Sequence, residues 1–226
     1  MKGNSDGDAR FWDRIARKYA ADKIADLAGY ERTLDRTRHF LRSGDTVLEL
    51  GCGTGTTALT LAPHVSRIVA TDVSSEMIAI AREKAAAQNC SNAEFAIATP
   101  DSLSWPEGSF DAVLAFNLLH LLAARPSAFA QVHRLLKPGG VFITKTFCLT
   151  EMNVLIRLAV PVMRMVGKAP YVAFFSAGEL ESEIEASGFT IVERARHGSG
   201  RKEPRIFLVA RTAQHRRAAT AVTASL

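Results

Sequence analysis

A glycine-rich run followed by an acid carries the strongest chemical signal in the sequence. In VLELGCGTGTTA, residues 47–58, Gly51, Gly53 and Gly55 separate a β-branched run from the start of a helix. Glycine is needed where the backbone turns with positive φ or where a ligand lies against it. Asp72 follows Gly51 by 21 residues and ends the next expected strand. A carboxylate there can accept hydrogen bonds from both ribose hydroxyls, so the pattern predicts an adenosine-type ligand.

Two classes of adenosine ligand compete for this loop. A dinucleotide fingerprint reads G-x-G-x-x-G and places a pyrophosphate on the helix N-terminus. Here Thr56 stands where the third glycine would be, and Glu49 precedes the loop. A carboxylate at that point opposes a pyrophosphate and favours a cationic ligand. Both features favour S-adenosylmethionine over NAD, and a glycine turn without a ligand is the plainer alternative.

The elements that must position these residues alternate between β-branched runs and helical segments. Such alternation, with nearly continuous apolar strands, indicates a parallel sheet covered by helices on both faces. Ser176 with Glu179 forms a capping box, and Gly188 stands where a C′ glycine belongs. The predicted strands are 46–50, 67–71, 93–97, 111–116, 140–146, 189–196 and 205–211, and the predicted helices lie within 8–42, 56–64, 74–88, 125–136 and 175–189.

Four motifs in order resemble the class I S-adenosylmethionine-dependent methyltransferases, a large group that includes small-molecule and quinone-pathway enzymes. They are ELGCGTG (49–55), ATDVSSEMIAIARE (70–83), LSWPEGSFDAVLAFNLLHLL (103–122) and LLKPGGVFITK (135–145), and the resemblance covers roughly residues 10–211. It implies a Rossmann-like α/β fold with a seven-stranded, mostly parallel sheet and an antiparallel last strand. Helices would cover both faces, and a helical acceptor lid would lie between strands five and six.

The resemblance also implies roles for residues around the cofactor. The three glycines would hold its methionine and ribose portion, Asp72 would bind the ribose hydroxyls, and Tyr19 would come from an N-terminal helix that folds over the ligand. The full set expected to bind S-adenosylmethionine on this basis is Tyr19, Glu49, Gly51, Cys52, Gly53, Gly55, Asp72, Val73, Met77 and Asn117. For Met77 and Tyr19, plain core packing is an equal alternative.

The adenine-binding loop departs from the family pattern. The family commonly has Asp-Ala where this chain has Thr99-Pro100. Threonine offers only a hydroxyl, and proline has no N–H to reach a ring nitrogen. A small shift of the loop would bring Asp101 and Ser102 to the adenine edge, with Leu103 packing beside the ring.

The acceptor region is expected after strand five, within residues 148–175. From Met152 to Lys168 the sequence is almost wholly apolar apart from one stripe on a helical wheel, formed by Asn153, Arg157, Arg164 and Lys168. Such a segment could roof an apolar pocket, lie in a membrane interface, pack in a dimer or cover its own core. The expected acceptor contacts are Met152, Leu155, Met163, Tyr171 and Phe175.

Methyl transfer does not require a base, because the sulfonium carbon is already activated and rate can come from positioning and desolvation. His120 is the best candidate for a catalytic base, since it lies four residues past the fourth predicted strand. A neutral imidazole there could take an acceptor proton. A histidine packed at the start of a helix is the alternative.

Composition and charge indicate how the chain is organised and which classes of binding partner are unfavoured. The 226 residues are 47% hydrophobic and 23% charged, which suits one domain over 1–212, with an N-terminal helical cap at 8–42. The net charge of +5 is accounted for by residues 201–226, and 213–226 reads as a basic, frayed tail. Asn117-Leu118-Leu119-His120 lacks the prolines and aromatic of base-methylating enzymes, which makes nucleic acid an unfavoured substrate.

Cysteine usage and hydropathy bear on compartment and metal. Three dispersed cysteines suit a reducing cytoplasm and provide no metal ligand spacing. No window is long and apolar enough to cross a membrane, and no secretion signal is evident, so the expected location is cytoplasmic, with peripheral membrane contact open for 152–168. The chain is expected to be a monomer or a homodimer.

The sequence thus predicts an S-adenosylmethionine-dependent methyltransferase acting on a small apolar or amphiphilic acceptor by in-line displacement. Three alternatives remain at this point. The chain could bind S-adenosylmethionine without turnover as a regulatory protein, methylate nucleic acid, or be an NAD-dependent oxidoreductase.

Replacing Arg157 and Arg164 tests the cationic stripe. If the stripe orients an acceptor lid or a membrane contact, the double substitution to Gln reduces acceptor turnover or binding to anionic liposomes. Cofactor affinity, measured by calorimetry, stays unchanged. A protein that no longer folds would instead favour a helix that covers its own core.

Overall fold

A single seven-stranded sheet forms the centre of the molecule. The computed structural model describes residues 5–151, 163, 169–200 and 203–214. The strand order is β3-β2-β1-β4-β5-β7-β6, and β7 is antiparallel to both of its neighbours, while the other described pairings are parallel. The strands are β1 (Thr46–Leu50), β2 (Arg67–Asp72), β3 (Ala93–Ile97), β4 (Phe110–Phe116), β5 (Leu136–Phe147), β6 (Thr190–Ala195) and β7 (Arg205–Arg211).

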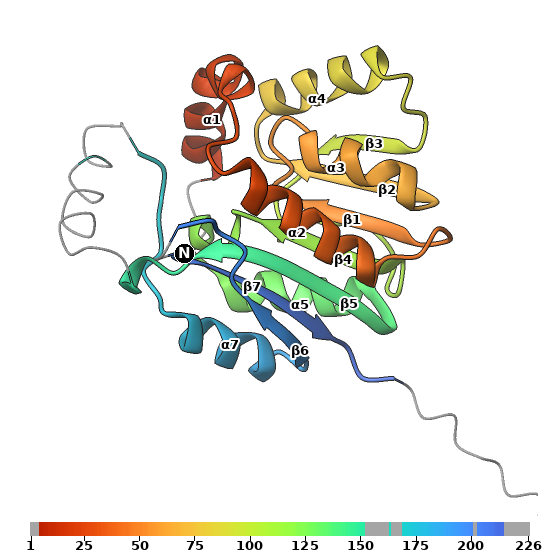
Figure 1. Ribbon diagram of the computed structural model, residues 1–226, viewed down its shortest axis with the longest axis vertical. Coiled ribbons are helices and arrows are strands. Elements are labelled where there is room, and N and C mark those ends of the chain that lie inside the picture. Colours follow the sequence, from red (N-terminus) through yellow and green to blue (C-terminus); the bar gives the residue numbers. More distant parts are fainter. Residues whose placement is uncertain (1–4, 152–162, 164–168, 201–202, 215–226) are drawn as a thin grey trace, which may run out of the picture.

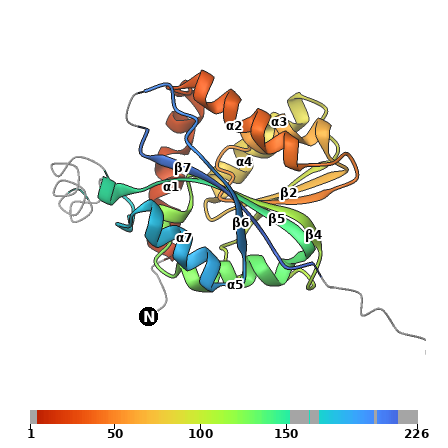
Figure 2. The same ribbon diagram turned by 60° about the horizontal axis from the view of Figure 1, so that its bottom comes forward.

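Helices cover both faces of the sheet. Figure 2 shows α2, α3 and α4 on one side and α5 and α7 on the other, and the buried apolar residues divide into two main clusters accordingly. The helices are α1 (Ser5–Ala21), α2 (Leu27–Phe40), α3 (Thr56–Leu61), α4 (Ser75–Ala87), α5 (Arg125–Leu135) and α7 (Ala177–Ala186), with 3-10 turns at Ala62–His64, Leu119–Leu121 and Leu149–Glu151.

The predicted fold class is confirmed, including the antiparallel last strand. Strands predicted at 46–50, 93–97 and 205–211 have those bounds. The fifth strand is longer than predicted, because Leu136 also pairs with Phe110 across a register shift. Most of the predicted lid, 152–162 and 164–168, and most of the tail, 215–226, lie outside the described residues.

Local capping fixes where the last helix starts and stops. The Ser176 Oγ accepts the backbone N–H of Glu179 at 3.3 Å, and the Glu179 carboxylate accepts the N–H of Ser176 at 2.7 Å. This is the capping box that the sequence predicted. Gly188 follows the helix with a φ of 90°, a conformation that only glycine adopts at little cost. Capped in this way, α7 is held in register against the β6 side of the sheet.

The first helix is fixed across the end of the sheet by polar contacts with α4. The Asp13 carboxylate accepts hydrogen bonds from Ser74 Oγ at 2.6 Å and from the Glu76 N–H at 3.1 Å, where the N-terminus of α4 favours a negative charge. Further along the two helices, Arg17 makes a bidentate pair with Glu83 at 2.8 and 2.9 Å. Figure 1 shows α1 standing beside α4 as a result. The helical cap therefore sits over the glycine loop.

Substitution of Gly55 should destabilise the fold. Gly55 has a φ of 76°, and a Cβ on it would lie 2.8 Å from both Ala81 Cβ and Phe95 Cε1. We expect Gly55→Ala to lower the free energy of unfolding by about 2–4 kcal/mol, through backbone strain and overpacking. Gly178→Ala, on open helical surface, is the matched control and should leave stability unchanged or raise it by up to about 1 kcal/mol. Equal stability of the two variants in urea denaturation would contradict this packing.

Candidate active site

A large cavity opens at the carboxyl ends of the parallel strands. Its volume is about 1470 Å³, which exceeds the range of roughly 300–1,000 Å³ usual for a single small-molecule site. The glycine loop, the end of β2, the segment after β4, and residues of α1 and α2 line it. The cavity therefore has room for an adenosine-type ligand and for a second molecule beside it.

The three glycines of the loop have different surroundings. All three have positive φ, at 65° for Gly51, 54° for Gly53 and 76° for Gly55. Gly51 and Gly53 line the cavity, and a Cβ on Gly53 would meet only Tyr19, at 3.7 Å. Gly55 lies outside the cavity lining and packs against α4 and β3. Its predicted contact with the cofactor thus finds no support in the geometry, and its role is to let the loop approach the helix.

Asp72 joins the end of β2 to the glycine loop. Its Oδ2 accepts the N–H of Gly53, and its Oδ1 accepts the N–H of Ser74, both at 2.9 Å. The side chain is 9% exposed and lines the cavity. Burial raises the pKa of Asp72 more than these N–H donors lower it. Each carboxylate oxygen can accept more than one hydrogen bond, so ribose hydroxyls can add to those already present.

Glu49 is a buried acid without a full set of partners. It is 2% exposed on β1, and its Oε2 accepts no hydrogen bond from the described residues. Burial, followed by the negative charge of Asp72, raises the pKa of Glu49 to about 8. The same surroundings raise the pKa of the Cys52 thiol. An orphaned carboxylate in a cavity is costly unless a ligand supplies a donor or a positive charge.

The residues present fit S-adenosylmethionine. Its sulfonium and ammonium groups are cationic, and the cavity presents Glu49 to them, while Asp72 is placed to accept the ribose hydroxyls. A pyrophosphate would bring two further negative charges beside two buried acids. When bound, the cofactor would supply an activated methyl group. The Gly51–Gly53 backbone, Asp72 and Glu49 are the groups that would hold it.

The N-terminal helix contributes aromatic residues to the same cavity. Tyr19 and Trp12 line it and meet edge to face, with ring centroids 6.3 Å apart. Partial burial, and then the charges of Asp72 and Glu49, raise the pKa of the Tyr19 hydroxyl. Met77 and Val73 also line the cavity beside the end of β2. Tyr19, Val73 and Met77, which the sequence analysis selected, thus line one cavity, together with Trp12, which it did not select.

The three residues predicted to bind adenine in the loop after β3 lie in different surroundings. Asp101, together with Thr99 and Pro100, lines the cavity. Ser102 instead closes the turn, because its Oγ accepts the Thr99 N–H at 2.9 Å. Leu103 is buried in the core on the α5 side and does not line the cavity. Of the three predicted residues, only Asp101 is therefore placed to contact a ligand.

The predicted acceptor residues are more scattered. Tyr171 lines the cavity, whereas Phe175 is 1% exposed and belongs to the core against α5 and α7. Met163 is 44% exposed and does not line the cavity. Met152 and Leu155 lie outside the described residues.

The segment after β4 borders the cavity with Asn117 and Leu118. Asn117 has a φ of 54° and donates its N–H to the Lys145 carbonyl at 2.7 Å. Asparagine is one of the few residues that adopts this conformation readily. A bond to the neighbouring strand thus fixes the turn that presents Asn117 at the cavity.

His120 points into the protein rather than into the cavity. It does not line the cavity, and its Nδ1 lies 3.0 Å from Thr146 Oγ1. Its ring packs edge to face on Phe147, with centroids 5.3 Å apart. Burial lowers the pKa of His120 to about 4, so the ring is neutral near pH 7. This placement matches a packed histidine, and a catalytic role for it stays an untested prediction.

Two lysines that line the cavity were not among the residues predicted from the sequence. Lys84 lines the cavity and donates to Thr54 Oγ1 at 2.8 Å. Its spacing of seven residues from Met77 puts both on one face of α4, which was the available signal. Lys145 also lines the cavity. The signal there was a single charge inside an otherwise uncharged strand, GVFITKT.

Other kinds of site are missing from the part of the chain that the structure describes. There, no three His, Cys, Asp or Glu side chains come together in a way that could hold a metal ion. Among the same residues, no helix combines the length and the apolar character needed to span a membrane.

Known proteins share both the motifs and the fold. Residues 47–140 match the family model described as a methyltransferase domain. The demethylmenaquinone methyltransferase of Symbiobacterium thermophilum is 30% identical over 140 residues, which are 58% of this chain and 55% of that protein. Over these residues the chain is similar to the family of methyltransferase domains, and its predicted resemblance to S-adenosylmethionine-dependent methyltransferases is confirmed. S-adenosylmethionine, favoured above on Thr56 and Glu49, is the cofactor of that family.

Two further comparisons concern a relative of similar sequence and a solved structure of similar fold. Phosphoethanolamine N-methyltransferase 1 of Arabidopsis thaliana is 29% identical over 64% of this chain and 32% of its own length. The YcgJ protein of Bacillus subtilis has a structure that matches with a TM-score of 0.67 at 19% identity, covering 81% of this chain and 99% of that one. The matched regions thus span about half or less of the two curated relatives, and the YcgJ likeness concerns the fold.

Titration of Glu49 should make the stability of this methyltransferase domain depend on pH. Between its ordinary pKa of 4.5 and the folded value of about 8, the folded protein holds a proton that the unfolded chain releases. The free energy of unfolding therefore falls as pH rises through that window, by up to about 1.4 kcal/mol per unit. Between pH 6.5 and pH 8, we expect the free energy of unfolding of the wild type to fall by about 2 kcal/mol more than that of the Glu49→Gln variant. Both free energies are measured by urea denaturation without cofactor.

The comparison between the two proteins isolates this one group. Histidines, whose unfolded pKa lies near 6.5, contribute equally to both proteins and cancel in the difference. Parallel stability curves from pH 6.5 to 8 would contradict a protonated Glu49 in the folded state.

Proposed function

We propose that the protein transfers a methyl group from S-adenosylmethionine to a small apolar or amphiphilic acceptor. The observation that carries this proposal is the orphaned, buried Glu49 beside Asp72 in a cavity of about 1470 Å³. The acids suit a cationic cofactor, and the remaining volume suits an acceptor. The demethylmenaquinone and phosphoethanolamine relatives act on small molecules by name, which supports an acceptor of that size.

The proposed roles of the residues follow from where they lie. Asp72 accepts the ribose hydroxyls, and the backbone at Gly51 and Gly53 lies against the methionine portion. Glu49 compensates positive charge near the sulfonium. Asp101 faces the adenine edge. Each of these residues lines the cavity, and none has to move to reach it.

Catalysis in this proposal rests on positioning and on exclusion of water. An in-line displacement at the sulfonium carbon needs the acceptor atom held close to the methyl group and in line with the departing sulfur. The apolar residues Leu118, Leu121 and Leu122 border the cavity beside Asn117 and would keep water from the reacting atoms. No residue is required to take a proton before transfer, which agrees with the placement of His120 outside the cavity.

The apolar segment 152–168 completes the proposal. It lies in the chain between β5 and Tyr171, which lines the cavity. We infer that this segment covers the acceptor or brings the site to an anionic membrane where an amphiphilic acceptor is dissolved. Quinone-type, headgroup and other amphiphilic acceptors all satisfy this description.

Ligand stabilisation and label transfer test the proposal. At a concentration one hundred times its Kd, S-adenosylmethionine should add about 2.7 kcal/mol, which raises the Tm by roughly 5–10 °C for a chain of this size. S-adenosylhomocysteine should also stabilise the protein, and NAD should not.

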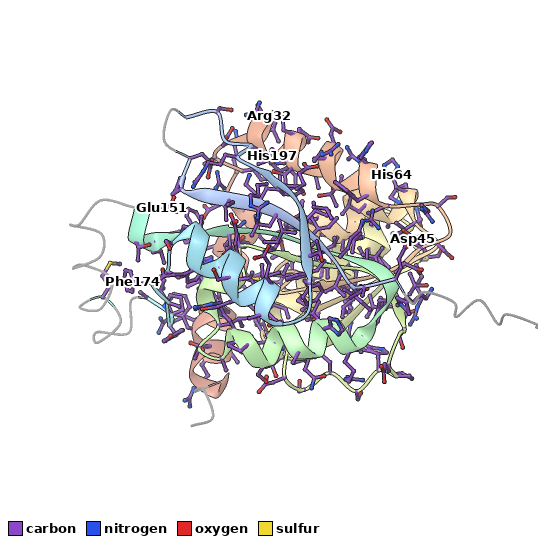
Figure 3. All side chains as sticks on the ribbon, turned by 90° about the horizontal axis from the view of Figure 1, so that it is seen from below. Arg32, Asp45, His64, Glu151, Phe174 and His197 are labelled. Carbon is purple, nitrogen blue, oxygen red and sulfur yellow. The ribbon has the colours of Figure 1, made fainter. Side chains whose placement is uncertain are left out.

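Asp72→Asn should weaken the binding of S-adenosylmethionine tenfold or more, because charge-assisted hydrogen bonds to the ribose are lost. Asp45→Asn, on the exposed loop labelled in Figure 3, is the matched control and should bind normally.

An acceptor screen with methyl-labelled S-adenosylmethionine, with and without anionic liposomes, then tests turnover. Stabilisation by NAD alone would overturn the proposal. Tight binding of S-adenosylmethionine with no label transfer to any small molecule would favour a regulatory protein that binds the cofactor without turnover.

A further inference from the structure

Lys145 is a buried cation on the α2 face of the sheet. It lies near the carboxyl end of β5, between Phe116 of β4 and Phe207 of β7 in the sheet register. The residue is 5% exposed. Lysine is almost never buried to this extent unless it is paired, because moving an ammonium group out of water is costly.

The hydrogen bonds of Lys145 leave it largely unsatisfied. Its Nζ donates to Thr33 Oγ1 at 3.0 Å. That hydroxyl gives its own proton to the Gly29 carbonyl at 2.8 Å and also lies 3.2 Å from His197 Nδ1. An ammonium group has three donors, and one is used here. Within the described chain, no carboxylate forms an ion pair with Lys145.

The charged groups around Lys145 are already engaged with other partners. Glu203 holds Arg205 through both carboxylate oxygens, and Asp26 accepts the N–H and the hydroxyl of Ser199. Arg32 donates to the His197 carbonyl at 2.7 Å, and Figure 3 shows Arg32 and His197 close together above the sheet. Burial, and then the charge of Arg205, lower the pKa of Lys145. Glu203 and Asp26 act on this ammonium group only through space, and no carboxylate of the described residues is hydrogen-bonded to it.

The same cavity that contains the cofactor residues reaches Lys145. Glu49, Phe116 and Lys145 all line it, together with Tyr30 and Thr33 of α2. In the order β1-β4-β5, adjacent strands lie about 4.8 Å apart and successive residues about 3.3 Å. The register offsets Lys145 from Glu49 by two strands and two residues, so their backbones are roughly 12 Å apart. One wall of the cavity thus runs from an acid, past an aromatic ring, to a cation.

We propose that Lys145 anchors an acidic oxygen of the methyl acceptor, either a carboxylate or an ionised aromatic hydroxyl. The inference rests on the proposed function and specifies its substrate class. An oxyanion would supply the directly bonded counter-ion that Lys145 lacks among the described residues, and would accept its remaining N–H donors. The acceptor would span from Lys145 past Phe116 toward the sulfonium beside Glu49, a distance suited to a molecule of one or two fused rings. An acidic group held at Lys145 would also fix which end of the acceptor faces the methyl group.

Matched probes test this charge preference. The protein saturated with S-adenosylhomocysteine is titrated with 2-naphthoate, 2-naphthol at pH 9, and the neutral 2-naphthamide, with binding followed by calorimetry. We expect 2-naphthoate or 2-naphthol to bind at least tenfold more tightly than 2-naphthamide. The better of the two tells whether a carboxylate or a hydroxyl is preferred. Equal binding of all three, or no saturable binding, would overturn the inference.

Variants of two lysines on the same strand separate binding from structure. Lys145→Met should lose the tenfold preference, and Lys145→Gln, which keeps a donor toward Thr33, should lose it as well. Lys137→Met is the matched control, because Lys137 lies at the opposite end of β5 and pairs with Asp111. It should keep the preference. If the Lys145 variants melt at a lower temperature but retain the preference, the lysine only ties β5 to α2 and the inference is wrong.

The cofactor readout keeps the two proposals apart. S-adenosylhomocysteine should bind the wild type and all three variants with the same affinity. Failure of the wild type to bind it would refute the proposed function, and the acceptor assignment would fall with it. Normal cofactor binding without an anion preference would refute the role of Lys145 and leave methyl transfer intact.

Discussion

Burial of two acids at the carboxyl end of the sheet is the constraint on which the rest of the site depends. Glu49 is the penultimate residue of β1, and Asp72 is the last residue of the neighbouring parallel strand β2, so the topology brings both acids to one cavity. Backbone N–H groups partly satisfy Asp72, whereas one oxygen of Glu49 has no partner among the described residues. Burying an acid without a full set of hydrogen-bond partners destabilises the folded protein. That cost is offset when a cationic ligand occupies the cavity.

The helices around the cavity are held by contacts that do not involve a ligand. Asp13 fixes α1 to the N-terminus of α4, and Arg32 fixes α2 to the loop after β6. The aromatic side of α1 therefore stays over the glycine loop. A site built in this way is preorganised, so binding need not order its walls, and less of the interaction energy is spent on closing it.

Charge is distributed unevenly along the cavity. Among the residues that line it, Glu49 and Asp72 lie on β1 and β2 with Lys84 of α4 nearby, whereas Lys145 and Arg205 lie on β5 and β7. In a low-dielectric cavity such charges act strongly, because little water screens them. Under the proposals above, a cationic cofactor and an acidic acceptor would occupy opposite ends, and their mutual attraction would bring them together.

The sequence by itself determined the sheet, its helices and the cofactor loop, because these depend on local patterns. The patterns are the alternation of β-branched runs with helical segments, the capping residues, and the spacing from Gly51 to Asp72. Only the tertiary structure decided which side chains face the cavity. It placed Phe175 in the core, turned Gly55 toward α4 and opened the cavity to Lys145. The reason is physical. A residue's face within its own element follows from local periodicity, but what covers that face depends on packing between segments distant in the sequence, such as the 112 residues that separate Thr33 from Lys145.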